Sequence, residues 1–214
     1  MRTCLVGSEM CIRDRNNRNN IFDLAGVFKI EDDDYPMNFK LITRNFNIAP
    51  FSAIGENVLQ NFKGYFNSDI DVTGTFYKPI FEGYINAVDS SFDVPYLGLR
   101  YGFVDDPTFT LNNQTINIKD FTLNEKKSNT SGVMNGKISH NRLKDWFLDF
   151  KIESKNLIAL NTQSSENEYY YGTGFLNGSA YFIGPGKDLD IEINGATQEN
   201  TKIIIPIRYG DGLD

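Results

Sequence analysis

The chain has 214 residues, a net charge of −7 at pH 7 and a single histidine. This length suffices for one substantial core, so we expect one domain or one stretch of a longer structure. The acidic charge argues against a nucleic-acid-binding protein, because such proteins need basic surfaces to meet phosphates.

Residues 1–15 differ in character from the rest of the chain. The stretch from Cys4 to Asp14 resembles the in-frame translation of a sequencing adapter, and its charged residues do not fit a secretory leader. We therefore interpret residues 1–15 as an adapter-derived scar that is not part of the fold. The remaining 199 residues carry a net charge of −8 and no cysteine, so no disulfide, zinc site or thiol nucleophile can be argued for them.

Helical periodicity occurs once with clarity, after Pro50. Apolar residues follow at three- and four-residue steps, namely Phe51, Ile54, Val58 and Phe62. Because proline is favoured at the first helical position, the pattern predicts a short amphipathic helix over residues 50–61. A weaker helical turn is predicted at 141–145.

Two-residue alternation dominates the chain from residue 70 onward. It is clearest at 148–153 and 189–194, where apolar residues alternate with charged or polar ones. Each such run is typical of a strand with one apolar and one polar face. Strands at this spacing, separated by turn residues such as Asp105-Asp106-Pro107, predict an all-β, mainly antiparallel protein with one or two short helices. The pattern alone leaves a sandwich, a barrel and an extended sheet open.

Aromatic residues support the β interpretation, and glycines refine it. Aromatics make up 14% of the chain, including 17 Phe and 11 Tyr, and such side chains pack well on strands. Many alternating runs contain an internal glycine, as at Gly64, Gly136 and Gly178. Glycine inside a strand marks a bulge or bend, so we expect a strongly curved and twisted sheet.

Residues that could carry catalysis or metal binding are sparse. His140 follows a strand-like run without a second histidine nearby, which favours a structural role, and no Gly-x-Ser-x-Gly elbow is present. No catalytic residue, metal site or cofactor is therefore predicted, and we expect a protein that is not an enzyme. The run Tyr169-Tyr170-Tyr171 is the best candidate for a ligand surface, although packing is the more common role of such residues.

The residues from about 61 to 206 also contain a series of landmarks in a fairly specific order. They are Ile70 to Thr75 with Lys78-Pro79 and Gly83, then Phe92 to Leu97 with Tyr101, then Gly132, Gly136, Ile138, His140, Trp146 and Leu148, and finally Tyr170 to Gly174 with Gly178, Gly184-Pro185 and Thr201 to Pro206. This series resembles the C-terminal conserved region of the TamB (translocation and assembly module) family of Gram-negative bacteria. On this resemblance, residues 16–214 are expected to be an internal fragment of one extended TamB-like β domain, truncated at both ends.

The resemblance implies a long antiparallel sheet folded like a taco shell or solenoid, in a protein anchored in the inner membrane and located in the periplasm. The membrane anchor is expected in the missing N-terminal part. The implied partners are phospholipid acyl chains and an outer-membrane barrel of the Omp85 type. The implied roles are lipid transport between the membranes, outer-membrane protein assembly and secretion.

Such a trough agrees with the alternation of apolar and polar residues, because one face would meet hydrocarbon and the other water. Twelve residues are the candidates for the lipid groove: Ile70, Val72, Phe121, Leu123, Leu148, Phe150, Ile152, Leu189, Ile191, Ile193, Ile203 and Ile205. The same residues would serve a closed core equally well, and the sequence leaves that choice open. The alternatives are a β-sandwich glycan-binding or adhesin module that uses Tyr169 to Tyr171, and a carbohydrate-active enzyme with two carboxylates.

Overall fold

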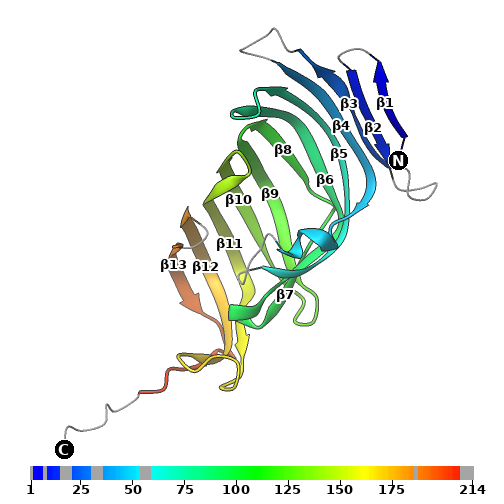
Figure 1. The fold of residues 1–214 in the computed structure, drawn as a ribbon. Helices are drawn as coiled ribbons and strands as arrows, with labels where there is room; N and C mark the ends of the chain where they lie inside the picture. Colours follow the sequence, from blue (N-terminus) through cyan, green and yellow to red (C-terminus); the bar gives the residue numbers. More distant parts are fainter. Residues whose placement is uncertain are drawn as a thin grey trace, which may run out of the picture.

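The computed structural model describes residues 2–6, 9–14, 21–29, 36–53, 59–185 and 188–207, the first two ranges as backbone alone. Fourteen strands form one sheet (Figure 1). The strands are β1 (Arg2–Val6), β2 (Glu9–Asp14), β3 (Ile21–Phe28), β4 (Met37–Asn47), β5 (Gln60–Gly74), β6 (Pro79–Val94), β7 (Leu99–Phe103), β8 (Thr108–Asn113), β9 (Thr115–Glu125), β10 (Thr130–Asn141), β11 (Lys144–Thr162), β12 (Tyr171–Pro185), β13 (Asp190–Thr197) and β14 (Lys202–Ile204).

The topology is a meander in which neighbours in the chain are almost always neighbours in the sheet. Twelve strands follow one path from β1 to β13, while β8 pairs with β6 and β9, and β14 pairs with β12 beyond the end of β13. Each described strand pair is antiparallel. The all-β, antiparallel prediction is confirmed.

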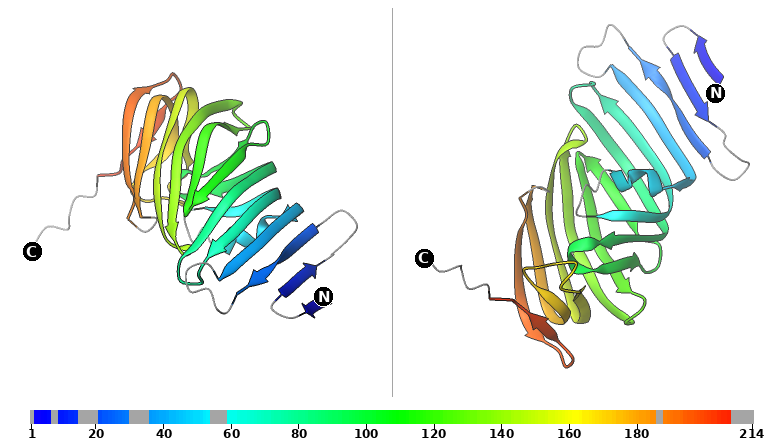
Figure 2. Two further views of the ribbon diagram at one scale, coloured as in Figure 1. Left: turned by 90° about the horizontal axis from the view of Figure 1, so that it is seen from above. Right: turned by 60° about the horizontal axis from the view of Figure 1, so that its bottom comes forward.

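The longest strands bend, so that the sheet curls into two facing walls. Figures 1 and 2 show β5 and β6 bending sharply, so that each contributes a part to either wall. Register shifts occur where neighbouring strands bend, between Thr43 and Phe46 in β4, between Lys63 and Tyr65 in β5, and between Ser154 and Leu157 in β11. A β-bulge bends its strand and increases the local twist. We call this row of irregularities the crease.

Left-handed backbone conformations and side-chain hydrogen bonds accompany the crease. Asn45, Asp89 and Asp120 have φ of 49°, 48° and 55°. Their N–H groups donate to side-chain oxygens of Asn67 (2.9 Å), Asp106 (2.9 Å) and Asn135 (2.7 Å), respectively. Asn and Asp tolerate this conformation better than most other side chains. In addition, a side-chain oxygen accepts a hydrogen bond from each N–H that the bulge removes from the ladder. These residues therefore stabilise the bend.

The helical segments are shorter than predicted. A 3₁₀ helix, η1 (Ala49–Ala53), replaces the start of the helix expected over residues 50–61, and Gln60 and Asn61 already belong to β5. Residues 54–58 of that prediction lie outside the described residues. A second 3₁₀ turn, η2 (Pro95–Leu97), was not predicted.

The helical turn predicted at 141–145 is wrong. Residues 142 and 143 form the tight turn between β10 and β11, and Arg142 and Leu143 have φ of 55° and 58°. Positive φ at both central residues is the type I′ geometry that matches the twist of the flanking strands. The hairpin, closed by the pairing of Asn141 with Lys144, therefore prevails over the helical propensity of the segment.

The N-terminal stretch differs from the expectation that residues 1–15 lie outside the fold. The structure pairs β1 with β2 and β2 with β3. Backbone pairing does not depend on side-chain identity, and without β2 the strand β3 would present an open edge that accepts any extended segment. The adapter origin of the stretch stays a prediction.

No helix in the described part of the chain is long and apolar enough to cross a membrane.

Candidate functional site

The inner face of the sheet carries aligned apolar residues that run from strand to strand. Residues paired across an antiparallel ladder lie on the same face, so the pairing defines rows across the sheet. One row consists of Leu24, Leu41, Ile70, Gly83, Leu111, Ile116, Ile138, Leu148 and Gly184. Another consists of Phe121, Met134, Ile152, Ala180 and Ile193. We call this surface the apolar trough.

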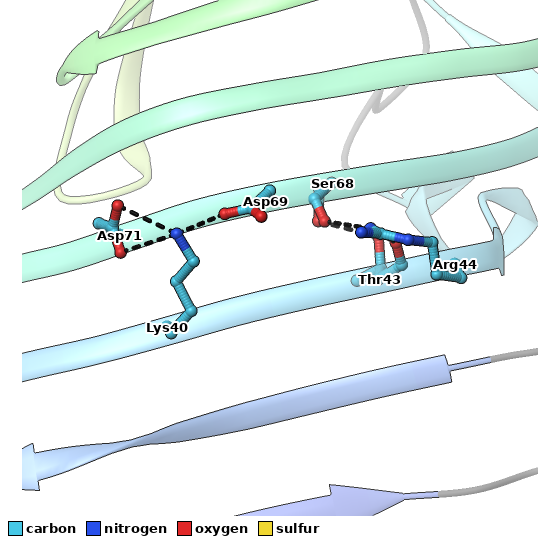
Figure 3. Close-up of polar contacts among 6 residues, drawn as sticks. All are labelled: Lys40, Thr43, Arg44, Ser68, Asp69 and Asp71. Carbon is cyan, nitrogen blue, oxygen red and sulfur yellow. Dashed lines mark hydrogen bonds and ion pairs between the residues drawn. The ribbon is translucent and has the colours of Figure 1, made fainter.

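The opposite face carries charged side chains that are exposed to solvent. Lys40 of β4 forms ion pairs with Asp69 (2.5 Å) and Asp71 (3.1 Å) of β5, as Figure 3 shows. Ser68, which precedes Asp69, lies on the inner face, where it and its ladder partner Thr43 are buried and share a 2.9 Å hydrogen bond. Lys137 and Asp149 form a further ion pair, at 3.6 Å. The polar half of the alternation therefore faces water and pairs acids with bases across strands.

The structure divides the twelve groove candidates by their exposure. The buried ones are Ile70, Phe121 and Leu123, and the half-buried ones are Val72, Leu148, Phe150, Ile152 and Leu189. The exposed ones are Ile191 (54%), Ile193 (62%), Ile203 (47%) and Ile205 (71%). The candidates thus form a gradient from a closed centre to an open end.

The centre of the trough is filled by aromatic side chains. Phe109 of β8 stands edge-on to Phe121 of β9 at 4.7 Å and to Phe103 of β7 at 5.8 Å between ring centroids. Phe92 of β6 lies 5.9 Å from Phe103. Leu99 and Tyr101 of β7 are buried in the same cluster. The trough is therefore not open along its whole length, because these side chains meet between the two walls.

Sequence reasoning missed the strand that closes the centre. Leu99, Tyr101 and Phe103 alternate with Arg100 and Gly102, which is the signal of a strand. That strand is short, and its contacts with β11 come from residues more than fifty positions later in the chain. Local periodicity carries no information about such contacts.

The open end of the trough lies at β12, β13 and β14, and we call it the mouth. Ile193 pairs with the buried Ala180, and Ile191 pairs with Phe182, so both continue rows of the inner face. Phe182 in turn stacks on Phe150 at 4.8 Å. In the other wall, Ile203 pairs with Gly172. The mouth thus continues the rows of the core, but its own side chains are exposed to solvent.

His140 has a structural environment. Its ring lies 4.9 Å from Trp146 and 5.7 Å from Phe81, between centroids, and its Nδ1 accepts a hydrogen bond from the Leu143 N–H at 3.2 Å. Burial lowers the pKa of His140 below its ordinary value. A neutral ring that accepts at Nδ1 holds the β10–β11 turn against the trough.

Glu125 is a buried carboxylate at the tip of the β9–β10 hairpin. Burial raises the pKa of Glu125, but hydrogen bonds from the Ser128 N–H and hydroxyl, each 2.7 Å, lower it, and the net pKa lies below its ordinary value. These bonds fix the loop that connects the strands. Glu125 therefore has a structural role in this loop.

The tyrosine run does not present a uniform surface. Tyr169 is exposed, while Tyr170 and Tyr171 are half-buried. The N–H groups of Tyr169 and Tyr170 both donate to Asn167 Oδ1, which makes the segment a turn. Among the described residues, no group of three or more His, Cys, Asp or Glu could hold a metal ion.

Comparison of the chain with models of protein families, with curated proteins and with solved structures finds no match.

Proposed function

We propose that this chain is a non-enzymatic segment of a TamB-like envelope protein, and that its mouth holds the hydrocarbon tails of phospholipids. The observation that carries the proposal is the exposure of Ile191, Ile193 and Ile203, whose ladder positions belong to the apolar inner face. The parent protein would lie in the periplasm, anchored in the inner membrane. It would work with an outer-membrane barrel of the Omp85 type in lipid transport, protein assembly or secretion.

The hydrophobic effect supports a hydrocarbon ligand at this place. Each methylene that leaves water contributes about 0.8 kcal/mol, so the free energy of binding favours a tail segment of a few carbons that covers the mouth. The attraction is non-directional, which lets a chain slide along the rows without breaking specific bonds. On the opposite face, Lys151 pairs with Glu153 and lies over the Tyr181 ring, so charged side chains stand on that face together with the exposed Ile183.

The filled centre restricts where a lipid can lie. Displacing the cluster around Phe109 and Phe121 would expose aromatic surface that is now buried, at a cost of several kcal/mol. A tail therefore occupies the mouth and the half-buried residues next to it, such as Phe150 and Ile152. Passage through the centre would require the walls to separate.

Photo-crosslinking tests the proposal. A photoreactive amino acid replaces Ile191 or Ile193 in separate variants, which are illuminated with vesicles of phosphatidylethanolamine. Matched controls carry it at Asp190 or Glu192, the neighbours that face the other side of the same strand. Phospholipid adducts should form at the two isoleucine positions and not at the two acidic ones.

A third position separates a mouth site from a continuous groove. A photoreactive group at Leu123, which is buried in the centre, should give few adducts. Equal labelling on the two faces of β13 would overturn the proposal. Strong labelling at Leu123 would show a lipid path through the centre instead.

A further inference from the structure

Two hairpin ends inside the meander hold apolar side chains out in solvent. One is the turn between β5 and β6, residues 75–78, and the other is the turn between β10 and β11, residues 141–144; we call them the two tips. Phe76 is 69% exposed, Tyr77 81% and Leu143 57%. Strands pair on both sides of each hairpin, β4 and β8 beside the first and β9 and β12 beside the second. The exposure of the tips is therefore a property of the interior of the sheet.

The apolar residues at the tips are not those that turns favour. The Lys78 N–H donates to the Thr75 carbonyl at 3.1 Å, so Phe76 and Tyr77 occupy the two central positions of the first turn. Such positions usually carry Gly, Asn, Asp, Pro or Ser. In the second turn Leu143 has φ of 58°, a conformation that suits glycine or asparagine far better than leucine. A strained apolar residue at an exposed position indicates a role for its side chain beyond the fold.

Basic side chains flank the apolar ones. Lys78 belongs to the first tip and Arg142 and Lys144 to the second, and all three are exposed. Within the part of the chain that the structure describes, none of the three forms an ion pair, although the whole chain has a net charge of −7. Aromatic and apolar residues beside such cations are typical of a surface that meets the interface of an anionic bilayer.

The two tips lie on the same rim of the sheet (Figure 1). The pairing order β5-β6-β8-β9-β10-β11 sets four strand spacings between them, about 19 Å at about 4.8 Å each. The β8–β9 end between them presents the polar Asn113 and Gln114. A stable protein partner needs continuous contact over about 800 Å², whereas a bilayer receives separate side chains. The separation of the tips therefore favours a membrane surface over a protein.

We propose that the two tips dock on the surface of an anionic phospholipid bilayer. Phe76, Tyr77 and Leu143 enter the interface, and the three basic residues lie beside lipid phosphates. The tyrosine suits this place because its ring is apolar and its hydroxyl group stays among the headgroups. This goes beyond the proposed function, which concerns tails held at the mouth and not the docking of a rim.

Co-sedimentation of the full chain with vesicles tests the proposal. Vesicles that contain phosphatidylglycerol should bind the chain at least fivefold more tightly than vesicles of phosphatidylcholine alone. The double variant Phe76→Ser/Tyr77→Ser should weaken that binding at least fivefold. The matched control Tyr96→Ser/Tyr169→Ser removes two exposed aromatic residues on the opposite rim and should bind as the original chain does. Absence of binding, or equal binding by the tip variant, would overturn the proposal.

The variant Leu143→Asn separates docking from folding. Asparagine tolerates the positive φ of this position, so the urea midpoint should stay constant or rise. Binding to the anionic vesicles should nevertheless fall at least threefold, because the apolar side chain is lost. Unchanged binding by this variant would contradict a role of the second tip.

Neutralisation of the tips tests the part that charge plays. The variant Lys78→Gln/Lys144→Gln should lose the preference for phosphatidylglycerol. The control Lys119→Gln/Lys126→Gln changes the net charge equally at exposed positions outside the tips, and it should keep that preference. Equal effects of the two variants would assign the preference to net charge and overturn docking through the tips.

The single tryptophan, Trp146, reports which part of the chain meets the bilayer. It is the third residue of β11, and its ring lies 4.9 Å from the His140 ring, beside the second tip. Lipids with a nitroxide quencher in the headgroup should quench its emission. The variant Trp146→Phe/Tyr169→Trp moves the reporter to the opposite rim and should show little quenching. Equal quenching at the two places would overturn the proposal.

Lipid held at the mouth and a docked rim can be told apart. A monomeric lysophospholipid needs no bilayer, so its photo-adducts at Ile191 should persist in Phe76→Ser/Tyr77→Ser. Adducts at Ile191 together with vesicle binding that ignores the tip substitutions would overturn docking and leave the mouth site intact. Self-association of the chain that the tip substitutions abolish would assign the tips to a protein contact and overturn docking as well.

Discussion

The hydroxyl group of Tyr101 donates a 2.6 Å hydrogen bond to the backbone carbonyl of Ile158, 57 residues later in the chain. The Ile158 N–H in turn donates to Thr130 Oγ1 at 3.1 Å. The β11–β12 register shifts between Ile158 and Leu160, so side chains complete the hydrogen bonding of Ile158 where the ladder is irregular. This pair joins β7 to β11 across the tip of the β9–β10 hairpin.

The variant Tyr101→Phe should reduce the free energy of unfolding by about 1–2 kcal/mol. It removes one buried hydrogen bond and leaves the Ile158 carbonyl without its donor, while the ring keeps its packing. Urea denaturation followed by circular dichroism measures the loss. Tyr77→Phe is the control, because Tyr77 is 81% exposed, and its midpoint should not move. An unchanged midpoint for Tyr101→Phe would show that the bond does not stabilise the fold.

A substitution in the centre should lower stability, whereas a substitution at the mouth should weaken lipid binding. Phe121→Ala should cost about 3–5 kcal/mol, because it empties part of the aromatic cluster. Ile193→Ala should change stability by less than about 0.5 kcal/mol, since its side chain is largely exposed, yet weaken lipid binding. Thermal unfolding and vesicle co-sedimentation measure the two effects. Similar losses of stability in both variants would contradict the division into centre and mouth.

The variant Gly136→Ala should destabilise the crease by about 1–3 kcal/mol. Gly136 has φ of 146°, and a methyl group there would collide with the Asp149 carbonyl and lie 2.5 Å from the Phe150 Cα. Gly102→Ala is the matched control, because its closest neighbour would be the Asn124 Oδ1 at 3.2 Å and the loss should be smaller. Chemical denaturation of both variants checks the order.

Stability should fall as the pH is lowered through the ordinary pKa of histidine, 6.5, owing to His140. Burial lowers its pKa below the ordinary 6.5, so the folded state binds fewer protons than the unfolded state, and acid favours unfolding. Protonation of Nδ1 would also remove the acceptor for the Leu143 N–H. The loss should begin near pH 6.5 and continue until the pH falls through the lower pKa of the folded state.

Urea midpoints at several pH values test this, with His140→Asn as the control. Asparagine can accept the same hydrogen bond without titrating, so its midpoint should stay nearly constant in this range. Asp93, whose pKa the Arg100 guanidinium lowers, and Glu125 contribute at more acidic pH, near and below their ordinary values. An equal pH dependence in the asparagine variant would assign the effect to other groups.

The alternation of residues determined much of this fold before any tertiary contact was known. Runs such as Leu148 to Glu153 specify a strand with two unlike faces, because side chains alternate across a pleated backbone. Glycines such as Gly136 marked bends, since only glycine takes that backbone conformation readily. Local rules failed at 141–145, where the geometry of the β10–β11 turn prevailed, and over 50–61, where η1 is short.

By itself, the sequence determined the all-β class and the alternation that gives the strands an apolar face, and it supplied twelve groove candidates. Only the tertiary structure decided which of them are covered: Phe121 lies beneath aromatic rings from β7 and β8, while Ile193 lies at the uncovered end. The reason is that periodicity is a property of neighbours in the chain, whereas coverage depends on which distant strands the crease brings face to face.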